Sequence, residues 1–336
     1  MKRVMFLFTL LIIGRIAVPG QGNPLFSRNI HFNSGKETLY GQMILTDTTG
    51  KIPLVVFLSG SGPSSSYRTN YAGFLRFFFE EKLLGQGIAL MYFDKRGVGQ
   101  STGNWYKTDF YERAADAAAA IDFACNTGWI DPARICVAGH SQGGWIAQIV
   151  AARYPERISC AVSMSGATFG VFQQLVNDYQ SERVCKGVDS TLAHQKAVQK
   201  AQLTMRVVRW FPLTENMKQL KLIGDFDPRK EIQNIRLPVL FTFAGNDELV
   251  YPAWCMDVLH GLYPSGIPAN FTVKTFPGTD HGYHIAAFCS RDTGKRGHES
   301  EEVRQYVTEW MIRQFTGISD GGKNVLHENN LKYKQR

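Results

Sequence analysis

Short runs of apolar residues alternate with helix-patterned stretches along most of the chain. The apolar runs have the length of strands covered on both faces, and they fall at residues 54–58, 88–93, 135–138, 158–164, 237–243 and 271–276. Residues with helical spacing lie between and after these runs, at 71–84, 109–125, 145–153, 253–262 and 301–315. This alternation predicts an α/β fold with a mainly parallel central sheet and helices on both of its faces.

Two stretches depart from the alternation. Residues 28–32 and 38–45 have strand-like patterns around the turn Asn33-Ser34-Gly35, which predicts an antiparallel hairpin at the start of the sheet. Residues 167–234 carry helical patterns only, at 171–179, 192–210 and 215–222. Because this segment leaves the sheet after one strand and returns before the next, we expect it to lie above the carboxyl ends of the strands as a lid.

The N-terminus has the pattern of a secretory signal peptide. Lys2 and Arg3 precede an apolar stretch at residues 4–14, and small residues follow up to residue 22. The apolar stretch is too short to span a bilayer. We therefore predict a signal peptide over residues 1–22, with an uncleaved anchor as the alternative. The mature protein is expected in the periplasm or outside the cell, without stable membrane insertion.

The helical segment divides the remaining chain. Residues 23–166 are predicted to form the first part of the core, residues 167–235 the lid, and residues 236–317 the second part of the core. Residues 318–336 are rich in glycine and polar residues, which predicts a flexible tail. A chain of 336 residues with 44% hydrophobic content can bury one large core.

Charge and cysteine content limit the classes of function. The formal charge of +8 falls to +5 without the three basic residues of the leader, and no basic stripe with interleaved aromatics occurs, which argues against nucleic-acid binding. Cys136 and Cys160 lie in expected core strands and are predicted to be buried thiols. The other four cysteines can form disulfides in an oxidising compartment, but their spacing gives no connectivity and no metal site.

The run at 135–138 ends in a G-x-S-x-G sequence, in which Gly139 and Gly143 flank Ser141. Glycines at these positions allow a tight strand-to-helix turn, because any side chain would crowd the strand or the helix. Such a turn exposes the serine hydroxyl at the edge of the sheet and directs the N-terminus of the next helix toward it. Ser141 is therefore the candidate nucleophile.

A serine hydroxyl needs a base, and the base needs a carboxylate to orient it. The run at 237–243 leads to Asp247, and the run at 271–276 leads to His281, so the chain order is serine, aspartate, histidine. Glu248 is the alternative to Asp247. His284, with Asp280 as a local partner, is the alternative to His281.

Two further motifs complete a resemblance. Gly60-Ser61-Gly62-Pro63 follows the third strand, and Asp94-x-Arg96-Gly97-x-Gly99-x-Ser101 follows the fourth. With the G-x-S-x-G turn, the chain resembles the α/β-hydrolases over residues 28–317, and it is most similar to bacterial esterase-like serine hydrolases with a helical lid.

This resemblance implies roles for five residues. Ser141 would be the nucleophile, His281 the general base and then acid, and Asp247 the orienting carboxylate. The backbone N–H groups of Ser61 and Gln142 would form the oxyanion hole, although the first donor can lie one residue away within 59–62. No metal or organic cofactor is implied, and the expected partner is a small-molecule ester.

Neighbouring residues are expected to have structural roles. We expect His140 to contribute packing beside the nucleophile. Asp94 and Arg96 are expected to form an ion pair that braces the active-site loops, and Ser101 to belong to the same turn.

Three functions fit these patterns. A carboxylic ester hydrolase is the first, and an aminopeptidase-like serine peptidase on the same fold is the second. A non-catalytic binding module is the third, although such a protein usually lacks a member of the triad and this chain has all three. The patterns fix neither the acyl size nor the oligomeric state.

Overall fold

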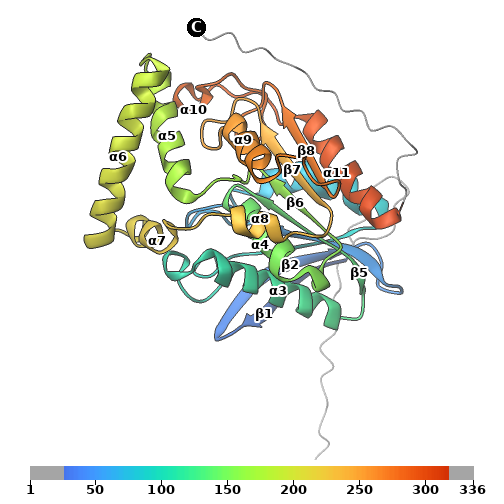
Figure 1. Cartoon of the computed structure of the whole chain (residues 1–336). Coiled ribbons are helices and arrows are strands. Elements are labelled where there is room, and N and C mark those ends of the chain that lie inside the picture. The colour runs from blue at the N-terminus through green and yellow to red at the C-terminus, as the bar shows by residue number, and fades with distance from the viewer. Residues whose placement is uncertain (1–25, 318–336) are drawn as a thin grey trace, which may run out of the picture.

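The computed structural model describes residues 26–317, which form one eight-stranded sheet flanked by helices (Figure 1). The strands are β1 (Phe26–Ser34), β2 (Glu37–Leu45), β3 (Ile52–Leu58), β4 (Ala89–Phe93), β5 (Ile130–His140), β6 (Cys160–Met164), β7 (Val239–Ala244) and β8 (Phe271–Phe276). Their order across the sheet is β1-β2-β4-β3-β5-β6-β7-β8. β1, β2 and β4 pair antiparallel and all other neighbours pair parallel, which confirms the predicted sheet and its opening hairpin.

The helices follow most of the predicted ranges. They are α1 (Ala72–Leu75), α2 (Glu81–Leu83), α3 (Phe110–Asn126), α4 (Gln142–Arg153), α5 (Val171–Cys185), α6 (Ser190–Trp210), α7 (Glu215–Ile223), α8 (Arg229–Asn234), α9 (Pro252–Leu262), α10 (Ser290–Thr293) and α11 (Glu301–Thr316). A π-helical turn, η1 (Arg76–Glu80), joins α1 to α2, so the helix expected over 71–84 is not a regular α-helix. The short helices α8 and α10 were not predicted, because each is too brief to show a helical period.

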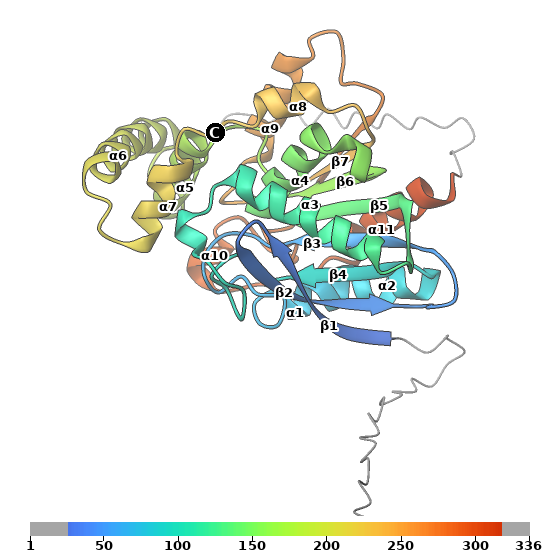
Figure 2. The ribbon, with the colours of Figure 1, turned by 90° about the horizontal axis from the view of Figure 1, so that it is seen from below.

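The central strands contribute side chains to two hydrophobic clusters, one on each face of the sheet. Along β3, Leu54 and Val56 join the cluster that contains the buried residues of α3 and α4. Val55 and Phe57 join the cluster that contains those of η1 and α11. Successive side chains of a strand point to opposite faces, and Figure 2 shows α3 and α4 on one side of the sheet and α1 and α2 on the other. This is why a continuous apolar run marks each central strand.

Helices α5–α8 lie between β6 and β7 and form the segment predicted as a lid, called the helical insertion below (residues 167–235). One buried asparagine of α5 connects the insertion to the loop after β7. Asn177 Nδ2 donates to the carbonyl of Glu248 at 3.1 Å, and the N–H of Tyr251 donates to Asn177 Oδ1 at 2.6 Å. The insertion is therefore anchored at the carboxyl end of β7.

A disulfide links the same helix to the segment after β8. Cys185 at the end of α5 is bonded to Cys289, which precedes α10. Arg291 strengthens this connection, because its Nη1 lies 2.7 Å from Asp178 Oδ1 on α5. The sequence left this pairing open, whereas the prediction of buried thiols at Cys136 and Cys160 is confirmed.

The predicted signal peptide (residues 1–22) and tail (residues 318–336) lie outside the described residues. Among residues 26–317, every helix falls short of the length and apolar character needed to cross a bilayer.

We expect Cys289→Ser to lower the free energy of unfolding of the oxidised protein by about 2–5 kcal/mol, because the cross-link restricts a long loop of the unfolded chain. Urea unfolding with and without reductant measures the change. The matched control is Cys125→Ser, at a half-buried free thiol. Equal stability of wild type and Cys289→Ser in the absence of reductant would contradict this expectation.

Candidate active site

Ser141 lies at the junction of β5 and α4 in a strained backbone conformation, with φ 59° and ψ −122°. Two close approaches require glycine on either side of it. A Cβ on Gly139 would lie 1.9 Å from the carbonyl oxygen of Gly143, and a Cβ on Gly143 would lie 2.0 Å from that of Leu58. The strain persists because the surrounding structure fixes it, as at other functional turns. The expected strand-to-helix turn is present.

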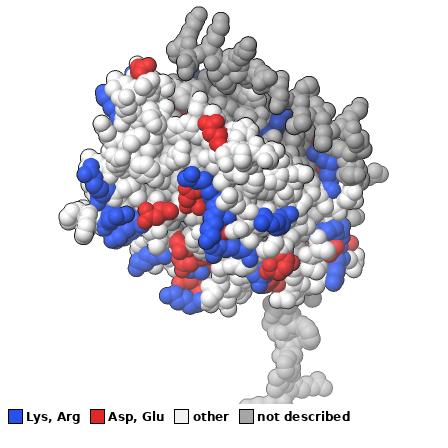
Figure 3. Space-filling model, in the orientation of Figure 1, with Lys and Arg blue, Asp and Glu red and all other residues white. Residues whose placement is uncertain are grey.

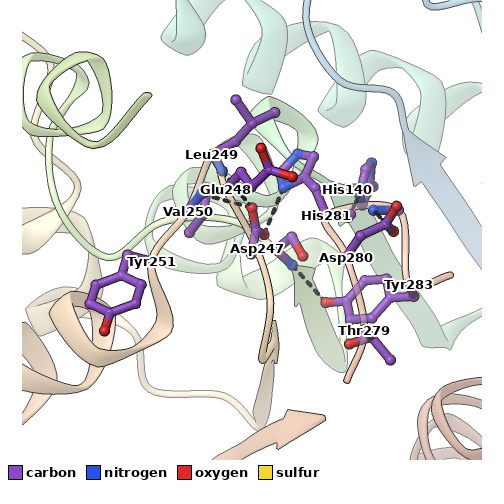
Figure 4. A network of polar contacts seen from close by, with 12 residues as sticks. His140, Asp247, Glu248, Leu249, Val250, Tyr251, Thr279, Asp280, His281 and Tyr283 are labelled. Carbon is purple, nitrogen blue, oxygen red and sulfur yellow. Dashed lines mark hydrogen bonds and ion pairs between the residues drawn. The ribbon is translucent and has the colours of Figure 1, made fainter. Parts of the chain in front are cut away.

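Asp247 and His281 come together as the sequence predicted. His281 Nδ1 lies 2.7 Å from Asp247 Oδ2, and the Asp247 side chain is fully buried. The other carboxylate oxygen, Oδ1, accepts the N–H groups of Leu249 at 2.8 Å and Val250 at 2.9 Å (Figure 4). The loop after β7 thus holds the carboxylate, and the carboxylate holds the imidazole.

The environment of His281 suits a base. Burial by itself would lower the pKa of His281, but the charge and hydrogen bond of Asp247 outweigh it, so the pKa is raised. With Nδ1–H donated to Asp247, the lone pair resides on Nε2. Nε2 is buried and has no hydrogen-bond partner within residues 26–317. The Ser141 hydroxyl is therefore not hydrogen-bonded to His281 in this structure, although such contacts are often long before substrate binds.

The alternative residues are engaged elsewhere. Glu248 Oε1 accepts the N–H of Arg291 at 2.9 Å. His284 Nδ1 lies 3.1 Å from Asp280 Oδ1, and Asp280 Oδ2 lies 3.0 Å from Arg296. The structure thus brings Asp247 and His281 together, whereas Glu248 and His284 contact other residues.

A chain of hydrogen bonds lies beside Ser141. The N–H of Gly60 donates to Tyr71 Oη at 2.9 Å, and this hydroxyl pairs with His140 Nδ1 at 2.8 Å. His140 Nε2 pairs with the backbone carbonyl of His281 at 2.7 Å. The carbonyl requires a proton on Nε2. Burial lowers the pKa of His140 to about 3, so the ring is neutral and Nδ1 accepts from the Tyr71 hydroxyl.

His140 therefore does more than the packing that was predicted. It connects the segment of Gly60 to the backbone of His281, and its ring centroid lies 4.9 Å from that of His281. The sequence carried no signal for its contact with Tyr71, since the two residues lie on different elements. Because His140 directly precedes Ser141, the same contacts bring the His281 loop beside the strand-to-helix turn.

The N–H groups predicted for the oxyanion hole occur on two adjacent segments. Gln142 is the first residue of α4, so its N–H has no acceptor within the helix. Gly60 lies against the turn, since a Cβ at Gly60 would be 3.3 Å from Ser141 Cβ. The N–H of Gly60 is occupied by Tyr71, which favours Ser61 among the donors of this loop.

The prediction of an ion pair between Asp94 and Arg96 is wrong. Arg96 pairs with Asp116 at 2.8 Å and with Glu112 at 3.0 Å, both on α3. Asp94 instead accepts the N–H of Tyr67 at 3.2 Å. Arg96 thus connects its loop to α3. Sequence spacing could not indicate this contact, because the partners lie in another element. Ser101 does belong to the turn, where its hydroxyl donates to the carbonyl of Asp94 at 2.7 Å.

Two buried cations beneath the loop of residues 59–61 were not predicted. Lys95 Nζ donates to the carbonyl of Gly60 at 2.7 Å. Arg113 Nη2 donates to the carbonyl of Ser59 at 2.6 Å, and its Nη1 donates to Gln142 Oε1 at 3.3 Å.

No group of three or more histidine, cysteine, aspartate or glutamate residues in the described part of the chain is arranged to hold a metal ion.

Residues 70–285, nearly two thirds of the chain, match the family model described as serine aminopeptidase, S33 (Hydrolase_4). The chain belongs to this family. The protein is therefore a hydrolase with the α/β-hydrolase fold, and the resemblance seen in the sequence is confirmed.

Curated relatives of this hydrolase match over part of their length. The palmitoyl-protein thioesterase ABHD10 of Rattus norvegicus mitochondria is 29% identical over 141 residues, which cover 41% of this chain and 43% of the relative. The multifunctional-autoprocessing repeats-in-toxin protein of Vibrio vulnificus is 34% identical over 116 residues, which cover 34% of this chain and 2% of that protein. The chain thus spans less than half the length of these relatives.

Solved structures share the fold of the hydrolase. Est1E from Butyrivibrio proteoclasticus with bound ferulic acid has a TM-score of 0.57 at 16% identity, covering 85% of this chain and 99% of that one. The Pyrococcus furiosus esterase Pf2001 has a TM-score of 0.58 at 16% identity, covering 87% and 92%. A putative dipeptidyl aminopeptidase IV from Bacteroides ovatus has a TM-score of 0.55 at 14% identity, covering 88% and 36%.

Proposed function

We propose that this hydrolase cleaves carboxylic esters of small molecules through an acyl-enzyme on Ser141. The observation that carries the proposal is the contact of Asp247 with His281 Nδ1, which leaves the buried Nε2 atom of the ring without a partner within residues 26–317. His281 is also tied through its carbonyl to His140, the residue before the strained serine. A base, its orienting carboxylate and a hydroxyl thus converge from three segments.

The reaction follows from these positions. Ser141 Oγ attacks the ester carbonyl while His281 Nε2 takes its proton. Negative charge develops on the carbonyl oxygen, where the N–H groups of Ser61 and Gln142 stabilise it. Loss of one such donor typically lowers the rate by about 10²–10³-fold. His281 then protonates the leaving alcohol. In the second half, water gives a proton to His281 Nε2 and attacks the acyl carbonyl, and Ser141 Oγ leaves with that proton as the acid is released.

Several observations favour an ester over a peptide. One solved structure with the same fold is an esterase, another has ferulic acid bound, and one curated relative is a thioesterase. The family description names an aminopeptidase, so a serine aminopeptidase is the second candidate. An aminopeptidase has to hold a free amino group near the nucleophile, and the carboxylates of Asp247 and Glu248 are already engaged by His281 and Arg291.

We further propose that the mature protein acts in the periplasm or outside the cell. The signal-like leader supports this location. The disulfide between Cys185 and Cys289 supports it independently, because such bonds persist in oxidising compartments.

We expect purified wild type to hydrolyse 4-nitrophenyl acetate and to be labelled by a fluorophosphonate probe, because both reactions require an activated serine. Ser141→Ala should lose the labelling and nearly all turnover. Aminoacyl-4-nitroanilides, assayed in parallel, separate the two candidate activities. Turnover of the anilides without turnover of the ester would support the aminopeptidase. Well-folded wild type that is not labelled would support a binding module.

We expect kcat/KM to fall as the pH is lowered through the pKa of His281, since only the neutral imidazole accepts a proton. Asp247 raises this pKa, so Asp247→Asn should move the acid limb of the profile to lower pH. The same change should lower kcat by about 10⁴-fold, because the imidazole loses its orientation. Asp225→Asn, at an exposed turn, is the control. An unshifted acid limb in Asp247→Asn would contradict the assignment.

A further inference from the structure

Two buried cations lie next to the proposed oxyanion hole, and the mechanism above does not use them. Lys95 is 4% exposed and Arg113 is 6% exposed. Neither forms an ion pair with a carboxylate within residues 26–317, whereas the neighbouring Arg96 forms two. Burial and the charge of Arg113 lower the pKa of Lys95. The charge of Asp94 opposes this lowering, and Asp116 acts likewise on Arg113, but neither carboxylate forms an ion pair with the cation. Burying such a charge is costly, and the hydrogen bonds of both side chains go to the loop of residues 59–61 and to Gln142.

The contacts of both cations converge on the donors of the oxyanion hole. The carbonyl of Gly60, which accepts from Lys95, and the N–H of Ser61 are the two ends of one peptide unit. A peptide whose carbonyl accepts a hydrogen bond becomes a stronger donor at its own N–H, because hydrogen bonds in a chain polarise one another. Arg113 fixes the preceding carbonyl, that of Ser59, and reaches the side chain of Gln142.

We propose that Lys95 is a positioning residue that orients and polarises the Gly60–Ser61 peptide, so that the N–H of Ser61 binds the oxyanion more strongly than the neutral substrate. Arg113 supports the same loop from the carbonyl of Ser59. The inference rests on the proposed function, because it requires Ser141 to form a tetrahedral intermediate.

The test compares two ligands that differ in oxyanion formation. An aryl trifluoromethyl ketone adds the serine hydroxyl and becomes an oxyanion, whereas its methyl ketone parent binds as a neutral carbonyl. Lys95→Met removes the charge and the donor while keeping the length of the side chain. We expect it to lower kcat by about tenfold or more, by analogy with loss of an oxyanion donor. It should weaken the trifluoromethyl ketone similarly and leave KM and the methyl ketone within about twofold. Lys36→Met, at an exposed lysine, is the matched control.

The binding of the two ketones distinguishes a specific role of Lys95 from a general structural one. Equal weakening of both ketones would show a general structural defect and overturn the proposal, as would no change in either. Should Lys95→Met fail to fold, Lys95→Gln, which retains a neutral donor, undergoes the same comparison. Fluorophosphonate titration of wild type and Ser141→Ala tests the proposed function separately. Failure of that titration would reject the nucleophile rather than Lys95.

An independent observation concerns the surface of the helical insertion. Trp210 is 75% exposed, Phe211 66% and Leu213 81%, which is unusual for three large apolar side chains within four residues. Leu203 and Val207 precede Trp210 by seven and three residues on α6, so they share its face of the helix, and both are exposed. These five residues are called the insertion tip below.

The insertion tip is surrounded by positive charge. Residues 190–223 contain one acidic residue, Glu215, and six basic ones: Lys196, Lys200, Arg206, Arg209, Lys218 and Lys221. Figure 3 shows basic side chains along the left edge of the molecule, where Figure 1 places α6 and α7. Apolar side chains with aromatic anchors and flanking cations suit the interface of an anionic bilayer.

We propose that the insertion tip docks on the surface of a bilayer that contains anionic lipid. A second copy of the chain is the less suitable occupant, because a two-fold contact would bring the same patch together and place Arg206 and Arg209 against like charges. The docking is peripheral, with Trp210, Phe211 and Leu213 entering the headgroup region.

Co-sedimentation with vesicles tests this docking. We expect wild type to bind phosphatidylcholine vesicles that contain phosphatidylglycerol, and to bind pure phosphatidylcholine vesicles at least several-fold less. Added salt should weaken the binding. The triple variant Trp210→Ser, Phe211→Ser, Leu213→Ser should lose it, and Leu192→Ser, an exposed apolar residue at the other end of α6, should not. Binding that survives in the triple variant would overturn the proposal. So would a wild type that does not bind, or a dimer that depends on the insertion tip.

Discussion

The close approach of backbone segments around Ser141 is the constraint on which the active site depends. Gly139, Gly143 and the carbonyl of Leu58 are packed so tightly that no side chain fits between them. This packing holds Ser141 at positive φ and brings the end of β3 against the start of α4. The proposed nucleophile and the loop that carries the proposed oxyanion donor Ser61 are therefore placed by the same contact.

Hydrogen bonds between loops also hold the segments of the site together. Tyr71 and His140 connect Gly60 to the carbonyl of His281, so the loop of the proposed oxyanion donor and the proposed base share one hydrogen-bond network. The insertion is connected to the loop of Asp247 through Asn177, and to the segment after His281 through the disulfide of Cys185. The loops that carry Gly60, Asp247 and His281 are thus joined to one another by side chains from distant elements.

Burial acts differently on the two histidines of the site. His140 is buried and His281 is largely covered, yet the pKa of His140 is lowered to about 3, whereas that of His281 is raised. The difference lies in the partner of Nδ1, which is a neutral hydroxyl for His140 and the carboxylate of Asp247 for His281. One ring thereby stays neutral and serves as a structural connector, and the other is suited to take up a proton.

The sequence by itself determined the alternation of strands and helices, the strained turn at Ser141 and the residues that come together as Asp247 and His281. These features are local: a strand, a pair of glycines or a residue just after a strand is recognised from residues that are neighbours in the sequence. Only the tertiary structure decided the partner of Cys185, the contact of Tyr71 with His140, and the pairing of Arg96 with Asp116 rather than Asp94. Each of those joins elements that are separate in the chain, so the contact depends on how the layers pack and not on any sequence period.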